Sequence, residues 1–423
     1  MGTAMPEHRL RVLAIATHPV QYAAPIFRLM AQQPQIDFHV AYCGMRGAEA
    51  GHDPEFGHSV KWDVPLLDGY AWTHVPNHGS GTESFFGLRN PGLWKLIRNG
   101  RFDAILCYAG YLRATFWISF LAAKTTRTAF LFGTDTVTLT PLDGRMWKRP
   151  IKRLAWPLLF RLADQVIVPS SGTRELMRSL GIPEERVTLT PNIVENDWWI
   201  AQSAGVDRNA VRQSWGASPE DMIVLFCAKL QPWKRPLDLL KAFAAAELPR
   251  ALLVFAGEGP LRAELESAAA SLGVAGRVRF LGFVNQRQLP GIYRAADILV
   301  LPSEYDAFGL VINEAMLCGC PVVASDRVGA VRDLIEIGRT GFVYRCGDLS
   351  ELASLLRGLS THDPPLSELG RAARARMESW SPRENILATV NAITKAVSRI
   401  GRGASPPLVA ANAGNPSARK ISE

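Results

Sequence analysis

The chain has 423 residues, more than one ordinary hydrophobic core accommodates, so two domains are expected. Hydrophobic residues make up 48% and charged residues 20%, as in a soluble globular protein, and no uncharged apolar run reaches the ~18 residues of a spanning helix. The formal net charge of +8 suits anionic partners such as nucleotides, phospholipids or nucleic acid, but does not choose among them.

The start of the chain and its cysteines indicate a reducing compartment. The first apolar run is short and is followed by His18 and Pro19, so it predicts a strand rather than a signal peptide. Cys318 and Cys320 are too isolated a pair for a zinc site. The other cysteines are scattered through apolar segments, and we expect buried thiols in a cytoplasmic protein.

In the first half, continuous apolar strands alternate with helical segments. The expected strands cover residues 10–17, 36–43, 102–110, 128–135 and 164–170, and the first helix covers residues 24–33. Residues 44–92 are rich in Gly, Pro, His and Trp with weak periodicity, and we expect an irregular segment near a site.

The second half repeats the pattern more clearly. Strands are expected at residues 221–230, 250–259, 278–284, 297–303, 321–326 and 340–344. Helices are expected from residue 236 and at residues 260–273, 286–296, 309–317 and 349–359. Such alternation predicts parallel sheets covered by helices on both faces, so both halves are expected to be doubly wound α/β domains.

Two carboxylates frame an apolar helix in the second half. Asp306 lies in the loop after the strand at 297–303, and the next helix is expected to start near Phe308 or Gly309. Ligands of open α/β sheets bind beyond such strand ends, and the helix amides and dipole favour an anion. Glu314 would lie in the second turn among buried residues, where a carboxylate needs a hydrogen-bonding partner such as a ribose diol. A simple helix-dipole role is the alternative.

These residues also carry a resemblance. The stretch DAFGLVINEA resembles the E-x7-E region of retaining glycosyltransferases of family 4, which have the GT-B fold. The resemblance continues in the family's order through KLQPWKRPLDLL, FAGEGPLRAEL, FLGFV, LPGIYRAADILVLPS, CGCPVVASD and GRTGFVY. The segment VIVPSSGTRELMRSLGIPEERVTLTPNIVE is similar to the end of the family's first domain. Coverage is nearly complete from residue 165 to 350 and looser before it.

The resemblance implies a GT-B protein with two Rossmann-like, doubly wound domains facing a cleft. Residues 8–200 would form the N-terminal, acceptor-side domain, and residues 205–375 the C-terminal domain that binds a nucleotide-sugar donor. A helix at 380–400 would pack back on the first domain. Residues 401–423 are low in aromatic residues, and we expect a disordered tail.

The same resemblance implies roles for residues around the helix. Glu314 would hold the ribose, and Asp306 would contact the donor sugar where the family usually has Glu. Asp is one methylene shorter, and Glu304 could compensate for the lost reach. Backbone amides near the diphosphate and sugar would come from Phe308, Gly309 and Leu310.

Two lysines are expected to stabilise the leaving diphosphate. Charge builds on its phosphates in the transition state, and fixed cations aimed there lower the barrier. The resemblance points to Lys229, where the family has Arg, and to Lys234; without it, a solvated loop would explain both. Phe283 and Val284 would flank the base. The implied enzyme needs no metal and no cofactor.

The expected acceptor side of the cleft departs from the family. The usual glycine pair after the first strand is replaced by THPVQYAAP, in which His18 and Gln21 would face the cleft; a cap or core histidine is the alternative. CYAGY stands where the family has a histidine. Asp135, at another strand end, is a further cleft candidate, with turn chemistry as its alternative.

Residues 144–162 form a basic segment without an acidic residue. Trp147, Ile151, Leu154 and Leu158 recur at helical spacing, so the segment could lie on an anionic membrane surface and bring the protein to a lipid-linked acceptor. A solvated basic face is the alternative. No stacking platform for nucleic acid is recognisable, and we expect no nucleic-acid partner.

The expected function is transfer of a sugar from a nucleotide-sugar to a glycan or lipid-linked acceptor, with retention of the anomeric configuration. A GT-B epimerase would convert the donor without an acceptor, and a phosphorylase would need a Schiff-base lysine that is not identifiable. A non-catalytic glycan- or membrane-binding scaffold would bind nucleotide weakly. The expected cellular location is the cytoplasm, including peripheral attachment to the inner face of the cell membrane.

Overall fold

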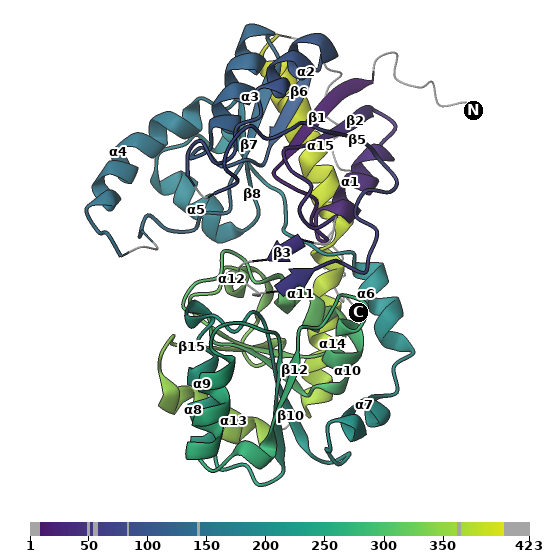
Figure 1. The fold of residues 1–423 in the computed structure, drawn as a ribbon, viewed down its shortest axis with the longest axis vertical. Helices are drawn as coiled ribbons and strands as arrows, with labels where there is room; N and C mark the ends of the chain where they lie inside the picture. The colour runs from purple at the N-terminus through teal and green to yellow at the C-terminus, as the bar shows by residue number, and fades with distance from the viewer. Residues whose placement is uncertain are drawn as a thin grey trace, which may run out of the picture.

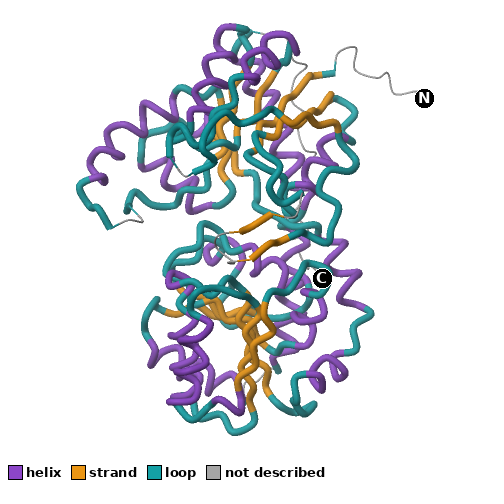
Figure 2. Tube along the Cα trace, viewed as in Figure 1, coloured by secondary structure: helices purple, strands orange, loops and turns teal. Residues whose placement is uncertain are grey.

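A computed structural model describes residues 9–48, 51–53, 58–82, 84–141, 144–361 and 365–401. These residues form two parallel sheets, one in each half of the chain, each flanked by helices (Figures 1 and 2). The tail expected at 401–423 lies, from residue 402 onward, outside the described residues. Two α/β units with parallel sheets are the fold class that the sequence predicts.

The first sheet has seven parallel strands. In spatial order they are β5 (Ala71–His74), β2 (Ile36–Tyr42), β1 (Leu10–Ala16), β6 (Ala104–Cys107), β7 (Ala129–Gly133), β8 (Gln165–Val168) and β9 (Val187–Leu189). The helical segments of this half are α1 (Ala24–Ala31), α2 (Gly92–Gly100), α3 (Ala114–Thr125), α4 (Lys148–Arg161), α5 (Ser171–Ser179) and η1 (Glu184–Arg186). Strands β6 and β8 are buried throughout, as their continuous apolar sequences require.

The second sheet has six parallel strands. In spatial order they are β12 (Val278–Gly282), β11 (Ala251–Ala256), β10 (Met222–Cys227), β13 (Ile298–Leu301), β14 (Val322–Ser325) and β15 (Gly341–Tyr344). Its helical segments are α6 (Asn196–Ala204), α7 (Arg208–Ser214), η2 (Pro232–Lys234), α8 (Pro236–Ala245), α9 (Arg262–Ser271), η3 (Ala275–Arg277), α10 (Leu289–Ala295), α11 (Leu310–Leu317), α12 (Val331–Leu334), α13 (Leu349–Ser360) and α14 (Leu366–Arg376).

The chain crosses between the two units twice. After β9, α6 packs against α10 and α11 of the second unit. After α14 and η4 (Met377–Ser379), α15 (Pro382–Arg399) returns to the first unit, where Figure 1 shows it in yellow. Ser381 and Glu384 form a capping box at its start, and Ile393 and Val397 are buried in the same core as β1 and β2.

The irregular segment expected at residues 44–92 contains regular structure. β5 extends the first sheet by pairing with β2, and β3 (Gly51–Asp53) pairs antiparallel with β4 (His58–Val60). The expectation of an irregular segment is therefore wrong for these strands. β5 is an edge strand with mostly exposed side chains, so its sequence lacks the apolar signal of the central strands.

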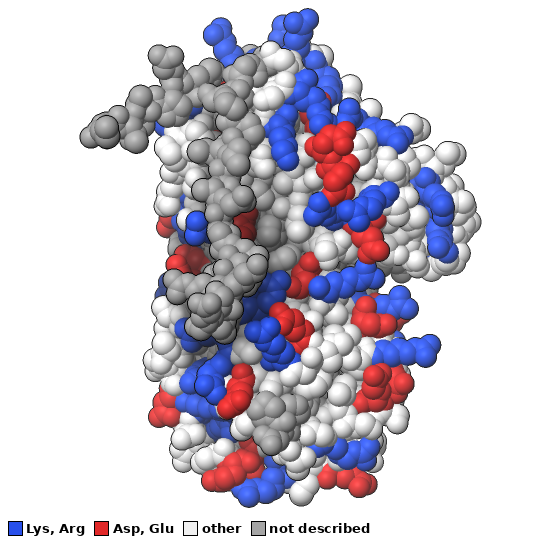
Figure 3. Space-filling view, turned by 180° about the vertical axis from the view of Figure 1, so that it is seen from behind, with Lys and Arg blue, Asp and Glu red and all other residues white. Residues whose placement is uncertain are grey.

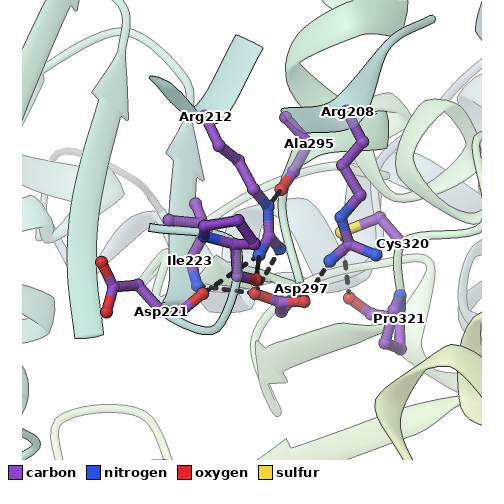
Figure 4. A network of polar contacts seen from close by, with 9 residues as sticks. Arg208, Arg212, Asp221, Ile223, Ala295, Asp297, Cys320 and Pro321 are labelled. Carbon is purple, nitrogen blue, oxygen red and sulfur yellow. Dashed lines mark hydrogen bonds and ion pairs between the residues drawn. The ribbon is translucent and has the colours of Figure 1, made fainter. Parts of the chain in front are cut away.

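An ion-pair network around the buried Arg212 holds helix α7 against the second sheet. Asp297, at the amino end of β13, contacts Arg208 and accepts from Nη2 of Arg212 at 2.6 Å and from the backbone N–H of Ile223 at 2.7 Å (Figure 4). Arg212, only 3% exposed, also donates from Nε to the Ala295 carbonyl at 2.9 Å. The network holds α7, β10 and β13 in one arrangement.

Hydrogen bonds join the two units on both sides of the space between them. On one side, the Ser171 amide donates to the Asp333 carboxylate at 3.0 Å. On the other, Nδ2 of Asn285 donates to the Lys61 carbonyl at 2.8 Å, and the Asp63 amide donates to Oδ1 of Asn285 at 3.3 Å. These contacts fix how the two sheets face each other.

Candidate functional site

The carboxyl end of β13 leads into a tight turn and then into α11. Gly309 caps the helix with φ of 92°, and a Cβ there would lie 2.8 Å from Cγ1 of Val328. Only glycine therefore allows this turn, which places the amides of Leu310 and Val311 at the amino end of α11, while the Ile312 amide donates to the Gly309 carbonyl at 2.9 Å. The Phe308 ring is buried and stacks on Trp380 with centroids 6.1 Å apart, so Phe308 could contribute its backbone but not its ring.

Glu314 is held by a buried tyrosine. The Tyr293 hydroxyl donates to Oε2 of Glu314 at 2.7 Å and lies 3.2 Å from Sγ of Cys227. Burial raises the pKa of Glu314 to about 7, and the hydrogen bond from Tyr293 opposes that rise. One carboxylate oxygen thus has a fixed partner, while the group stays easily protonated near neutrality.

Asp306 and Lys234 form a half-buried ion pair beside α11. Nζ of Lys234 lies 2.5 Å from Oδ2 of Asp306, and the two side chains are 18% and 17% exposed. Lys229 lies in the loop after β10, half-buried. Glu304 pairs instead with Nη1 of Arg235 at 3.1 Å and is 64% exposed. An ammonium has three donors, so Lys234 can hold Asp306 and still reach an anion.

Phe283 and Val284 follow β12 on the other side of the second sheet. Val284 packs against the main core, and the Phe283 ring lies 6.2 Å from the Trp62 ring of the first unit. The turn at Gly257 packs on the loop after β10: a Cβ on Gly257 would lie 2.0 Å from the Ala228 carbonyl oxygen. Packing therefore explains this glycine.

The candidates from the first unit lie at the carboxyl ends of their strands. His18, after β1, is half-buried with Nδ1 3.0 Å from the Thr17 hydroxyl, and Gln21 is half-buried ahead of α1. Asp135, after β7, is accessible to solvent, yet the surrounding protein raises its pKa, and the Asp306 charge adds to the rise. The two carboxylates, one from each unit, are therefore close enough for their charges to interact.

Tyr305 belongs to the same meeting point. Burial raises the pKa of Tyr305 to about 12, and the charges of Asp135 and Asp306 add to that rise. The carboxyl ends of β7 and β13 thus bring a tyrosine and two carboxylates together, beside the Lys234 ammonium. Such a group can bind hydroxyls of a ligand while the lysine balances the negative charge.

Several residues around the site carry no signal in the sequence. Tyr293 lies in a helical run where tyrosine reads as core, and its bond to Glu314 joins positions 21 apart. The contacts of Asn285 with Lys61 and of Phe283 with Trp62 form only because the two units face each other. No local spacing could have revealed these contacts; only the position of the strand ends pointed to the region.

Helix α4 projects from the first unit (Figure 1). Its buried side carries Trp156, Leu159 and Phe160. A second apolar row is exposed: Trp147, Ile151, Leu154 and Leu158 have exposures of 61%, 55%, 77% and 65%. Seen from behind in Figure 3, the outer part of this lobe is blue and white. Helix α4 therefore carries a second apolar row that is not buried within the protein's own fold.

The described residues contain neither a candidate membrane span nor a candidate metal cluster. No helix among them is long and apolar enough to cross a bilayer. No group of three or more His, Cys, Asp or Glu side chains in the same part of the chain could hold a metal ion.

Comparison with known proteins identifies the family. The model described as "Glycosyl transferase 4-like domain" matches residues 7–193, and that described as "Glycosyl transferases group 1" matches residues 207–376. Together they cover both sheets. Similar curated proteins include D-inositol 3-phosphate glycosyltransferases of Rhodococcus erythropolis, 33% identical over 47% of each chain, and of Streptomyces scabiei, 37% identical over 56% of this chain and 55% of that one. The chain thus spans about half the length of the curated relatives it matches.

Solved structures share the fold over most of the chain. HepE from Anabaena, in complex with UDP and glucose, has a TM-score of 0.70 at 21% identity, covering 90% of this chain and 99% of its own. Sucrose-phosphate synthase from Thermosynechococcus elongatus has a TM-score of 0.65 at 20% identity, covering 90% and 98%. The chain belongs to the family 4 glycosyltransferases and has the GT-B fold.

Proposed function

We propose that this protein transfers a sugar from a nucleotide-sugar to a glycan or lipid-linked acceptor with retention of configuration. The observation that carries the proposal is that Asp306, paired with Lys234, precedes α11, and that Glu314 lies in that helix, with Asp135 of the first unit close enough to interact with the charge of Asp306. A carboxylate for a diol, a cation for a diphosphate and free helix amides suit one ligand class, the nucleotide-sugars.

In the proposed complex Glu314 accepts from the ribose hydroxyls, with Tyr293 fixing its other contact. Lys229 and Lys234 bind the diphosphate, and amides of Gly309 and Leu310 complete that site. Asp306, with Glu304 as the alternative, contacts the donor sugar. Phe283 and Val284 lie beside the base, and His18, Gln21 and Asp135 belong to the acceptor side.

The proposed reaction is a front-face displacement. The acceptor hydroxyl oxygen bonds to the anomeric carbon on the face that the diphosphate leaves, and the bond from that carbon to the diphosphate oxygen breaks. The hydroxyl proton passes to the departing phosphate oxygen. Negative charge on the diphosphate grows during this step, and the two lysines stabilise it in place of a metal ion.

Binding of nucleoside diphosphates and nucleotide-sugars tests the donor site. UDP is the first probe because HepE was solved with UDP. We expect a thermal shift with at least one donor in the wild type and a much smaller one in Glu314→Gln, which loses the charge that ribose hydroxyls favour. A protein that responds to no donor, or a variant that responds like the wild type, would rule out the proposed site.

Glu314 also predicts a pH dependence. Its pKa of about 7 leaves the carboxyl mostly protonated at about pH 6, so UDP affinity should rise about tenfold toward about pH 8. Without ligand, the raised pKa acts on stability: the stabilising contribution is present below 4.5 and is lost as the pH rises through about 7. Calorimetric titration with UDP tests the first effect and thermal unfolding without ligand as a function of pH tests the second, each on wild type and Glu314→Gln.

The terminal phosphate of UDP also ionises at about pH 6, and this ionisation changes the UDP affinity of wild type and Glu314→Gln equally. The difference between the two pH profiles therefore reports Glu314 alone. Parallel profiles for wild type and Glu314→Gln would contradict the assignment of Glu314 to the ribose.

We also propose that α4 lies on an anionic membrane surface at the cytoplasmic face of the cell membrane. Its exposed row is apolar, and residues 144–162 carry six basic and no acidic side chains, a combination that binds anionic lipid through both burial and charge. Such docking would bring a lipid-linked acceptor close to the cleft.

Vesicle binding tests this docking. Changing Leu154 and Leu158 together to Glu should weaken binding to vesicles that contain phosphatidylglycerol at least tenfold, because each buried leucine contributes about 1.5–3 kcal/mol. Leu387→Glu, on α15 and 59% exposed, is the matched control. Equal loss in the control, or wild-type protein that remains in solution in a sedimentation assay, would count against membrane docking.

A further inference from the structure

A large pocket is lined by the sequence neighbours of Lys234 and Asp306. It has a volume of 1530 Å³ and lies between the two units. Trp233, next to Lys234, lines it, and so does Tyr305, next to Asp306. The backbone of these two segments is joined, since the Glu304 amide donates to the Trp233 carbonyl at 2.8 Å. A molecule in this pocket therefore contacts the two segments that carry Lys234 and Asp306.

The pocket is separate from the proposed nucleotide site. Glu314, Lys229 and Phe283 are not among the residues that line it. Its walls come from the segment after β14 and from α5 of the first unit, whereas Phe283 follows β12. No residue of the loop after β12 lines the pocket, so the pocket and the proposed base site occupy different parts of the space between the units.

The charges that line the pocket compensate one another. Arg235 pairs with Glu304 at 3.1 Å, and Arg332 of the second unit pairs with Glu175 of the first. Arginines already bound to carboxylates make a poor site for a phosphate, but they present donors and acceptors together. This combination suits the hydroxyl groups of an uncharged sugar.

One wall of the pocket carries an aromatic platform. The Trp233 side chain is 42% exposed although its ring is large and apolar. The flat face of an indole packs on the C–H face of a sugar ring, while hydroxyls such as those of Thr138 and Ser179 can bond its edges. The pocket also exceeds the ~300–1,000 Å³ of ordinary small-molecule sites, which favours a ligand of several sugar units.

We propose that this cavity, the Trp233 pocket, binds the acceptor as an uncharged oligosaccharide of more than one sugar, with Trp233 stacking on a ring close to the reacting hydroxyl. The inference rests on the proposed transfer reaction for the position of that hydroxyl. It adds the chemical class of the acceptor, the side of the cleft from which it enters, and a specificity-determining residue.

An array of immobilised bacterial oligosaccharides of one to eight sugars, probed in the presence of UDP, tests the inference. The wild type should bind at least one oligosaccharide more tightly than its terminal monosaccharide. Trp233→Ala should bind that glycan about tenfold more weakly, equivalent to about 1.4 kcal/mol, and Trp233→Tyr should recover most of the loss. UDP affinity, measured separately, should change less than twofold. Trp94→Ala, an exposed tryptophan on α2, is the control.

Two further measurements place the glycan in the pocket. Cys346 lines it and is partly exposed, while the other described cysteines are buried, so bound glycan should slow labelling of Cys346 by a maleimide. Ser179→Trp, which narrows the pocket from the opposite wall, should also weaken glycan binding. This variant keeps the test valid if Trp233→Ala does not fold.

The outcomes separate the inference from the donor proposal. If the wild type bound none of the nucleoside diphosphates tested, both the donor proposal and this inference would be overturned. Normal UDP binding without any glycan bound would overturn the inference alone, as would glycan affinity unchanged by both Trp233→Ala and Ser179→Trp. Tighter binding of phosphorylated than of uncharged sugars would overturn the argument from paired charges.

Discussion

Replacing Lys234 with alanine is expected to lower the kcat of sugar transfer or donor hydrolysis by about 100- to 1,000-fold, with a smaller effect on UDP affinity. That is the usual consequence of removing one group that stabilises charge formed in a transition state. The change also leaves Asp306 half-buried without the ammonium 2.5 Å away, so a negative charge would face the departing diphosphate. Steady-state kinetics and UDP calorimetry on the same variants measure the two effects.

Matched variants distinguish this role from a structural one. Lys241→Ala, on the exposed side of α8, should leave kcat unchanged. Asp306→Asn combined with Lys234→Ala should be less impaired than the product of the single changes predicts, because the two residues contact each other. If Lys234→Ala retains kcat within about threefold of the wild type, the proposed role in charge stabilisation is wrong.

The fold could be predicted because its signals are local. Strands such as Ile298–Leu301 are continuously apolar, and a helix follows most of them within a few residues. This alternation predicts the parallel strands found in the second sheet. β5 escaped prediction because an edge strand buries few side chains. The irregularity expected at 44–92 was inferred from composition, which does not report backbone pairing with a distant strand.

The position of the candidate site was also predictable, but its detail was not. A carboxylate in an apolar helix needs a hydrogen-bonding partner, so Glu314 pointed to a ligand or to a polar side chain. The structure shows that Tyr293 is such a partner, which the sequence could not identify. Likewise, the ion pair of Lys234 with Asp306 joins residues 72 apart. The Trp233 pocket needs both units in place, so no stretch of sequence encodes it alone.

Asp297 lies at the amino end of β13, and the candidate site lies at the carboxyl end of the same strand, so the contacts of Asp297 help to fix the position of the site. It precedes β13, whose carboxyl end leads to Asp306, and it compensates the buried Arg212. Asp297→Ala should lower the free energy of unfolding of the second unit by about 3–5 kcal/mol, since it leaves a buried charge without its partner. Urea unfolding followed by circular dichroism, with tryptophan fluorescence as a second probe, measures this loss.

The comparison with a surface pair makes the Asp297 prediction specific. Asp37 pairs with Arg11 at 3.2 Å, but both side chains are about half exposed, so Asp37→Ala should cost less than about 1 kcal/mol. In Asp297→Asn the side-chain oxygen can still accept the hydrogen bond from the Ile223 amide, which is 2.7 Å long in the wild type. The loss of unfolding free energy in this variant should therefore lie between those of Asp297→Ala and Asp37→Ala. Similar losses for Asp297→Ala and Asp37→Ala would mean that Arg212 finds another partner or water. β13 would then owe its position to apolar packing, and the loop that carries Asp306 would tolerate changes at the far end of its strand.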